Sequence, residues 1–164
     1  MALLFELVSE CGGRREDAEV FARHFDDFEW ALPDGSAGRC DVRFSRDVDG
    51  NWWCFVYPGG VSTSGVVSEG EARRMSELGG LLYGRLMTAP PFRYARVGVE
   101  VEEFATISEL SSADGKYHLP EHGVVLSQEV WERIGRPPGF TRFNEGHCWR
   151  PYNGEMYSRP SRRV

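Results

Sequence analysis

An unbroken run of apolar and aromatic residues, Trp52 to Pro58 (WWCFVYP), limits the folds open to this chain more than any other stretch. A strand with one solvent-facing side alternates apolar and polar residues, because successive side chains point to opposite faces of the sheet. This run does not alternate, and Gly50 and Gly59 lie just outside it. We therefore predict a strand that is covered on both faces, either by the rest of the chain or by a partner.

The apolar run forms the second half of a predicted hairpin. Residues 39–47 (RCDVRFSRD) also read as a strand, and Asp49-Gly50 between the two runs is a strong hairpin signal. A two-residue turn would pair Phe44 with Phe55 and place Trp52 on the sheet face away from the helices. A three-residue turn with a bulge at Gly50 would shift the register by one residue and exchange the two faces of the strand. The outward residues would then be Trp53, Phe55 and Tyr57 instead of Trp52, Cys54 and Val56.

We prefer the first of these two registers, because it places the bulkiest side chains against the helices. In that register Trp52 lies beside Asp41 and Arg43 on the outer face. Both registers leave apolar side chains on that face, so an apolar patch is predicted there in either case.

The order of the predicted elements indicates a ferredoxin-like fold. Residues 2–9 read as a strand, and residues 14–28 carry an apolar stripe at helical spacing. After the hairpin, Ser68 and Glu71 form a capping box that opens a second helix, which ends before Pro90. Residues 92–102 alternate as a half-buried strand. This β-α-β-β-α-β order predicts an α+β fold, a four-stranded antiparallel sheet with two helices on one face.

The rest of the chain is predicted to pack on this core within a single domain. Residues 1–103 form the ferredoxin-like core, and residues 104–164 form an irregular extension with a short strand (123–127) and a short helix (128–134). The helices of such a sheet cover only one face. Either the extension folds over the second face or that face is a docking surface for a partner. Four aromatic residues of the extension would supply the cover: Trp131, Phe140, Phe143 and Trp149.

The net charge and the cysteine content restrict the binding partners and the cellular location that we expect for this chain. A net charge of −6 argues against nonspecific nucleic-acid binding, which needs a basic surface, and suits a basic partner. We expect no membrane association, because no apolar run approaches the length of a membrane span. The four cysteines, at 11, 40, 54 and 148, form no CxxC pair. We therefore expect four reduced thiols in a cytoplasmic protein.

Motifs for catalysis, cofactors and metals are missing from the sequence. It contains no GxSxG, Walker or GxGxxG pattern, so no catalytic residue and no cofactor are predicted. A metal site built from His118, His122, His147 and Cys148 is disfavoured, because Pro120 interrupts the helical spacing of the first two. Asp47, Asp49 and Asn51 vaguely resemble a calcium loop, but a hairpin turn explains the same residues. The glycine spacing of the second helix, at 79, 80 and 84, is expected to let its backbone approach the sheet.

Two stretches near the C-terminus, HGVVLSQEVWERIGRPPGF (122–140) and HCWRPYNGE (147–155), resemble the C-terminal pattern of immunity-like proteins of bacterial polymorphic toxin systems. The resemblance implies one tight protein partner, a toxin domain, and no cofactor. It assigns a role to no residue of this chain.

The predicted function is therefore that of a protein-binding domain, an immunity-type neutraliser that docks on a toxin. Aromatic anchors and guiding carboxylates are typical of such interfaces. The candidate contact residues are Trp52, Asp41, Arg43, Glu100 and Glu102.

Two other functions stay open. One is a small-molecule-binding or enzymatic domain with a pocket between the sheet and the extension, lined by Arg96, Glu100 and His118. The other is a homodimer joined sheet to sheet.

Overall fold

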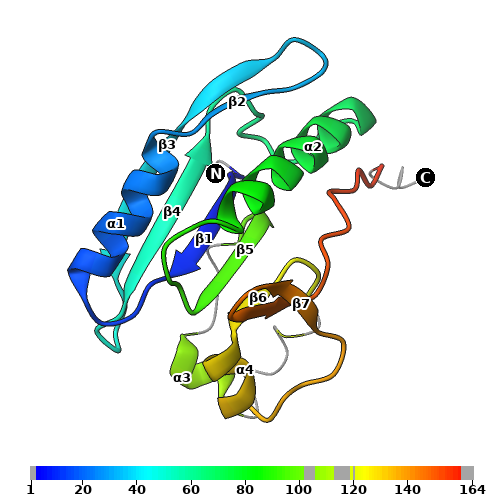
Figure 1. The fold of residues 1–164 in the computed structure, drawn as a ribbon. Coiled ribbons are helices and arrows are strands. Elements are labelled where there is room, and N and C mark those ends of the chain that lie inside the picture. The colour runs from blue at the N-terminus through cyan, green and yellow to red at the C-terminus, as the bar shows by residue number, and fades with distance from the viewer. Residues whose placement is uncertain (1–2, 102–105, 113–118, 120, 160–164) are drawn as a thin grey trace.

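The computed structural model describes residues 3–101, 106–112, 119 and 121–159. Within these ranges the protein is an α+β fold, in which eight strands form one antiparallel sheet and four helices pack against it (Figure 1). The strand order is β2-β3-β4-β1-β5-β6-β8-β7. The strands are β1 (Phe5–Glu10), β2 (Glu29–Ala31), β3 (Ala37–Arg46), β4 (Trp52–Pro58), β5 (Tyr94–Val99), β6 (Val125–Ser127), β7 (Thr141–Asn144) and β8 (His147–Trp149). The helices are α1 (Arg15–Asp26), α2 (Glu69–Leu86), α3 (Ile107–Leu110) and α4 (Gln128–Arg133).

The two longer helices cover one face of the sheet (Figure 1). The Ser68 hydroxyl accepts the Glu71 backbone N–H at 3.1 Å, so one half of the predicted capping box is confirmed. The Glu71 carboxylate accepts the Ser62 backbone N–H at 2.8 Å rather than that of Ser68. Both predicted apolar stripes are buried against the sheet, which removes them from water and holds the helices in place. The buried stripe residues are Ala18, Phe21, Ala22 and Phe25 in α1 and Ala72, Met75, Leu78, Leu82 and Leu86 in α2.

The apolar run of β4 is covered on both faces, as predicted. Cys54 and Val56 lie in the core beneath the two long helices. Trp53, which is 1% exposed, lies in a second apolar cluster on the opposite face. β1 beside it is buried at all six positions, so both central strands are enclosed by the chain itself.

The hairpin adopts the register that we did not prefer. β3 pairs Phe44 with Cys54, not with Phe55. The reason lies in the turn, where Gly50 takes a φ of 82° and donates its N–H to the Asp47 carbonyl at 3.1 Å. The Asp47 carboxylate also accepts the backbone N–H of Asn51 and the indole N–H of Trp53. These bonds build a three-residue turn with a bulge, which turns Trp52 toward the helix side.

Part of the C-terminal extension covers the second face. α3, α4 and residues around them pack on Val8, Trp53 and Tyr94. The buried members from the extension are Ile107, Leu110, Leu119, Val124, Leu126, Val130, Ile134 and Cys148. Trp131 and Phe140 pack against this cluster as predicted, whereas Phe143 and Trp149 lie on the helix side with Tyr83.

The sheet is larger than the four strands that were predicted. β6, β8 and β7 continue it beyond β5, and β2 extends it beyond β3. β2, β7 and β8 are short strands, of three or four residues, in segments that read as helix end or loop. The fourth predicted strand, residues 92–102, is shorter than expected and ends at Val99, because Glu100 takes a φ of 54°. None of the described helices has the length and apolar content needed to cross a bilayer.

The glycines of α2 differ in what they contact. A β-carbon on Gly79 would lie 2.6 Å from the Tyr152 ring, so Gly79 makes room for the C-terminal segment rather than for the sheet. Gly80 and Gly84 have nothing within 4 Å of a β-carbon. The expected close approach to the sheet is therefore wrong for Gly80 and Gly84, and at Gly79 the nearest atoms belong to Tyr152.

This difference predicts opposite effects of two neighbouring substitutions. Gly79→Ala should lower the free energy of unfolding by about 1–3 kcal/mol, because the new methyl group collides with the packed Tyr152 ring. Gly80→Ala should raise it by about 0.5–1 kcal/mol, because alanine is the better helix former and the site is open. Urea denaturation of both variants measures the two values. Equal effects at the two positions would contradict the contact between α2 and Tyr152.

Candidate binding cleft

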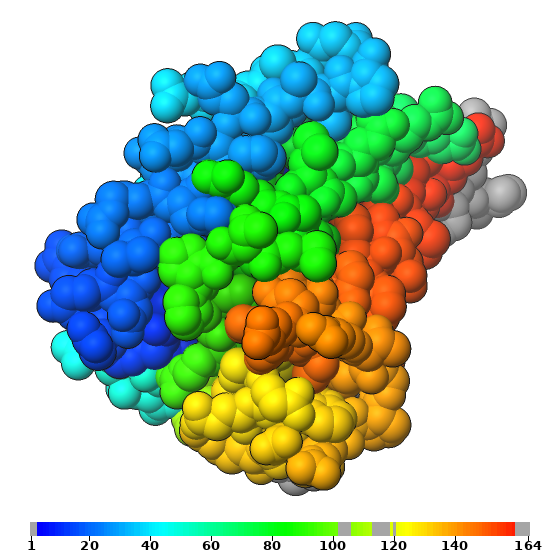
Figure 2. Space-filling model, in the orientation of Figure 1, coloured from blue at the N-terminus to red at the C-terminus, as the bar shows by residue number. Residues whose placement is uncertain are grey.

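A cleft of about 670 Å³ opens where the loop after α2 faces the β7–β8 turn. β5 and β6 join the two parts of the sheet here through two residue pairs, Tyr94 with Leu126 and Ala95 with Val125. Figure 2 shows the β7–β8 region, in orange, packed against the green atoms of α2 and the loop after it. The polar lining comes from four segments and comprises Asp17, Thr88, Arg93, Ser127, Glu129, Asn144, Glu145 and His147.

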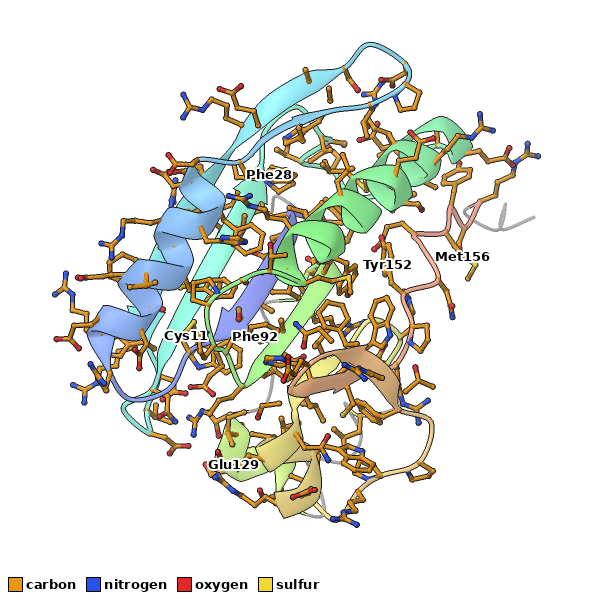
Figure 3. The ribbon with its side chains drawn as sticks, viewed as in Figure 1. Cys11, Phe28, Phe92, Glu129, Tyr152 and Met156 are labelled. Carbon is orange, nitrogen blue, oxygen red and sulfur yellow. The ribbon has the colours of Figure 1, made fainter. Side chains whose placement is uncertain are left out.

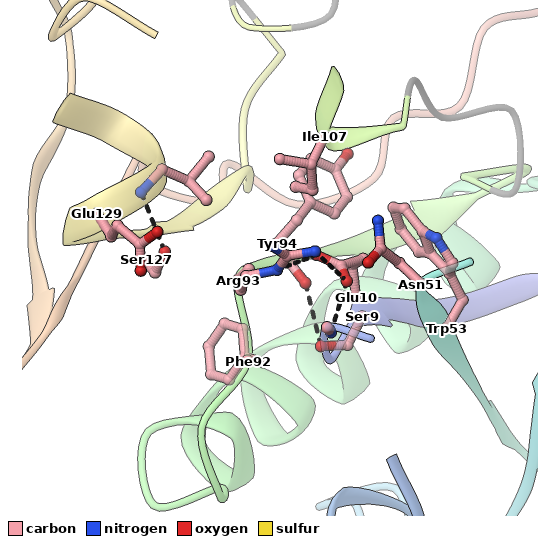
Figure 4. A network of polar contacts seen from close by, with 12 residues as sticks. Ser9, Glu10, Asn51, Trp53, Phe92, Arg93, Tyr94, Ile107, Ser127 and Glu129 are labelled. Carbon is pink, nitrogen blue, oxygen red and sulfur yellow. Dashed lines mark hydrogen bonds and ion pairs between the residues drawn. The ribbon is translucent and has the colours of Figure 1, made fainter. Parts of the chain in front are cut away.

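Arg93, which lines this cleft, forms an ion pair with Glu10 (Figure 4). Glu10 is fully buried at the end of β1, and Arg93 Nε and one terminal nitrogen donate to its two carboxylate oxygens at 2.7 and 2.8 Å. The Gly12 backbone N–H donates to the same carboxylate at 2.5 Å. The hydrogen bonds to Glu10 raise the pKa of Arg93. Arg93 is therefore charged, and Glu10 neutralises it within the protein.

Three carboxylates line the cleft around this neutral pair. Asp17, Glu129 and Glu145 are all exposed. Glu129 contacts Arg133 at 2.5 Å and Asp17 contacts Arg14 at 3.9 Å, but exposed pairs of this kind compensate charge only weakly. The side chains that line the cleft therefore include more carboxylates than cationic groups.

His147 ties the β7–β8 turn to the loop after α2. Its ring stacks on Phe92 with centroids 4.0 Å apart. One ring nitrogen lies 2.8 Å from the Asn144 side-chain oxygen and the other 2.9 Å from the Phe92 carbonyl. The Asn144 amide donates in turn to the Met87 carbonyl at 2.9 Å. Burial lowers the pKa of His147, and the hydrogen bond to the Phe92 carbonyl opposes this shift.

Cys11 also lines the cleft. Figure 3 labels Cys11 close to Phe92 and labels Glu129 on α4. The pKa of Cys11 is raised well above the usual value, first by the hydrogen bond with Cys54 and then by burial. The thiol is therefore protonated and a weak nucleophile.

No metal centre is evident among the described residues, where no three histidine, cysteine or carboxylate side chains gather. His122 accepts a hydrogen bond from the Asn153 backbone, and His147 is engaged as above. The Asp47 carboxylate binds backbone N–H groups of its own turn. His118 lies outside the described residues.

Asp41 and Arg43, predicted as partner contacts, lie together on the second face of the sheet. They form an exposed ion pair at 3.5 Å, and the Arg43 guanidinium lies 5.6 Å from the centre of the Tyr57 ring. All three line a separate hollow of about 310 Å³ beside residues 58–63.

Trp52 does not share that surface. It lies on the helix side, where its ring packs edge-on against Phe44 at 5.9 Å and the Arg15 guanidinium lies 5.5 Å from the ring centre. The expectation that Trp52 stands beside Asp41 and Arg43 is wrong, because the turn at Gly50 sets the other register.

Glu100 lies outside the strand on which it was predicted. Glu100 follows β5 in a turn and donates its backbone N–H to the Leu4 carbonyl, and Glu102 lies outside the described residues. Arg96, predicted to line a pocket with Glu100 and His118, forms an ion pair with Glu121 at 3.0 Å. Of the described candidates, Asp41 and Arg43 share one surface, and Trp52 lies on the other face of the sheet.

The residues that line the cleft were not predicted from the sequence. Its carboxylates come from three segments far apart in the chain, and no motif joins them. The one available signal is the pair of opposite charges at the ends of two predicted strands, Glu10 after the first and Arg93 within the last.

Comparison with known proteins gives no match to a protein-family model, a curated protein or a solved structure. The candidate site is therefore identified from the geometry of this chain alone.

Proposed function

We propose that this protein is a binding domain that holds a basic segment of a protein partner in the cleft between the α2–β5 loop and the β7–β8 turn. The observation that carries the proposal is the charge distribution of that cleft. Asp17, Glu129 and Glu145 line the cleft and are exposed, whereas the charge of Arg93, which also lines it, is paired with the buried Glu10. Such a surface attracts lysine and arginine side chains and repels acidic ones.

Apolar groups beside the carboxylates favour a protein partner over a small cation. Met87 lines the cleft and is 48% exposed, and Pro91 beside it is exposed too. A flexible thioether adapts to the surface of a docked chain. Carboxylates that orient a basic side chain next to an adaptable apolar contact are a common arrangement at protein interfaces.

The partner class that we propose is a toxin domain neutralised by binding. The support is the resemblance of residues 122–140 and 147–155 to immunity-like proteins, together with an acidic cleft that suits a basic toxin. Ser127 and Glu129 of the first stretch and His147 of the second line the cleft. A cytoplasmic location belongs to this proposal and is supported by four free, buried thiols.

We also infer that residues 5–99 form a ferredoxin-like unit inside the larger sheet. The supporting observations are the order β3-β4-β1-β5, the antiparallel neighbours, and α1 and α2 on one face. In this view β6, β8 and β7 are an addition that supplies the second wall of the cleft.

Charge reversal tests the binding proposal. The cleft variant carries Asp17→Lys, Glu129→Lys and Glu145→Lys, and the matched control carries Asp26→Lys, Asp27→Lys and Glu77→Lys, which are exposed carboxylates outside the cleft. The two variants have the same net charge. Calorimetric titration with an arginine- and lysine-rich peptide should show at least ~10-fold weaker binding for the cleft variant and less than ~3-fold for the control. Equal losses would mean that the peptide responds only to net charge, and would contradict the cleft.

A growth assay tests the neutraliser class separately. The protein is expressed in bacteria together with a candidate toxin domain, which is taken from the neighbouring genes where they encode one. We expect wild type and control to restore growth and the cleft variant to fail. Peptide binding at the cleft without any protection would keep the binding domain and overturn the neutraliser.

A further inference from the structure

Two of the four thiols lie close together at the base of the cleft. Cys11 Sγ and Cys54 Sγ are 3.9 Å apart, both side chains are buried, and the residues belong to neighbouring chain segments. Cys54 pairs with Ser9 in the β1–β4 ladder, and the Cys11 N–H donates to the Trp52 carbonyl at 2.8 Å. The two cysteines are thus diagonal neighbours whose side chains point to the same face.

We propose that Cys11 and Cys54 are a modification site for peroxides, at which oxidation joins β1 and β4 by a cross-strand disulfide. A disulfide needs its sulfurs about 2.05 Å apart, so the two sulfurs must approach by roughly 2 Å. Cys11 follows the last residue of β1 and precedes Gly12 and Gly13, whose backbone adapts more easily than the middle of a strand.

The position of the cleft indicates that the Cys11 thiol reacts before that of Cys54. Cys11 lines the cleft, whereas Cys54 is 0% exposed and donates its S–H to the Ala18 carbonyl of α1 at 3.4 Å. A small peroxide entering the cleft therefore meets Cys11, and Cys54 stands behind it as the second thiol.

The reaction balances with a peroxide as the only oxidant. The Cys11 thiolate attacks one peroxide oxygen, the O–O bond breaks, and the departing hydroxide takes the proton that Cys11 lost. Cys54 sulfur then attacks the sulfur of the resulting sulfenic acid, the S–O bond breaks, and the hydroxide leaves as water with the Cys54 proton. Hydrogen peroxide is reduced to two waters, and the two thiols lose two electrons and two hydrogens.

The raised pKa of Cys11 sets the pH dependence of the rate. The thiolate is the reacting species, so the rate should be low at neutral pH and rise as the pH is increased. The hydrogen bond from Cys54 to Ala18 is lost when the disulfide forms, which removes one contact between β4 and α1.

Peroxide treatment of the folded, full-length protein tests the proposal. After exposure to hydrogen peroxide the chain is unfolded in guanidinium and alkylated with N-ethylmaleimide. We expect two alkylated cysteines, Cys40 and Cys148, and a peptide cross-linked through Cys11 and Cys54 in the mass spectrum. The oxidised protein should also unfold at a temperature higher by about 5 °C or more, because the cross-link restricts the unfolded chain.

Variants identify the order of events. In Cys54→Ser, Cys11 should stop at the sulfenic acid and react with dimedone, while a Cys40→Ser control should form the disulfide as wild type does. Four alkylated cysteines in wild type, under conditions that oxidise the guanidinium-unfolded chain, would overturn the proposal. A cross-link between any other pair, or dimedone labelling of Cys11 in wild type without a disulfide, would do the same.

Discussion

Arg93→Met should lower the free energy of unfolding by about 3 kcal/mol, because it leaves the Glu10 carboxylate buried without its charged partner. Glu10 is 0% exposed, and two of its hydrogen bonds come from the Arg93 side chain. The Gly12 N–H alone remains as a donor from the described contacts. We place the effect at the lower end of the range for broken buried pairs, since the Arg93 side chain is 27% exposed and water can reach the site. Chemical denaturation at neutral pH measures the loss.

Two further variants separate charge from geometry at this pair. Arg93→Lys keeps the charge but cannot donate two parallel hydrogen bonds, so an intermediate loss of about 1–2 kcal/mol is expected. The double variant Glu10→Met with Arg93→Met removes both charges and should recover much of the stability lost in the single variant. A double variant less stable than the single one would show that the pair is not the main interaction of Glu10.

Tyr83→Ala should lower the free energy of unfolding by about 4 kcal/mol, because Tyr83 joins α2 to both parts of the sheet. The side chain is 4% exposed, and its ring packs against Phe143, Trp149 and Tyr152. Its hydroxyl donates to the Gly123 carbonyl at 2.7 Å. It also accepts the Val97 N–H at 3.0 Å. Burial raises the pKa of this phenol, so the hydroxyl keeps its proton and remains a donor.

Tyr83→Phe isolates the two hydrogen bonds from the packing of the ring. The ring stays, but the Val97 N–H and the Gly123 carbonyl lose a buried partner, which should cost about 1–3 kcal/mol. Amide hydrogen exchange at Val97 should accelerate in this variant relative to residues of β4. Unchanged exchange at Val97 would show that the hydroxyl does not hold β5.

The sequence was most informative where the periodicity was strong. The apolar stripes of α1 and α2 and the cap at Ser68 appear where they were predicted. The unbroken run of β4 correctly required cover on both faces, because each face packs into its own apolar cluster. These features depend on residue patterns within a single segment, so they can be recognised without knowledge of the tertiary structure.

Features that depend on contacts between distant segments were harder to predict from the sequence. The hairpin register is set by a glycine with positive φ and by the Asp47 carboxylate. The residues of this turn are compatible with both the two-residue and the three-residue turn, so the sequence did not decide between them. The strands β7 and β8 have four and three residues, too few for an alternating pattern to stand out. Their addition to the sheet creates one wall of the cleft, so Glu129 and Glu145 could not be grouped with Asp17 before the topology was known.

The most direct test of the account is to locate a bound basic peptide on the protein by NMR. An ¹⁵N-labelled sample is titrated with the arginine- and lysine-rich peptide, and backbone amide shifts are mapped onto the structure. The account predicts shifts concentrated at Arg93, Glu129, Glu145 and Gly146, the residues that line the cleft. Shifts centred on Asp41, Arg43 and Tyr57, or spread evenly over the acidic surface, would contradict it.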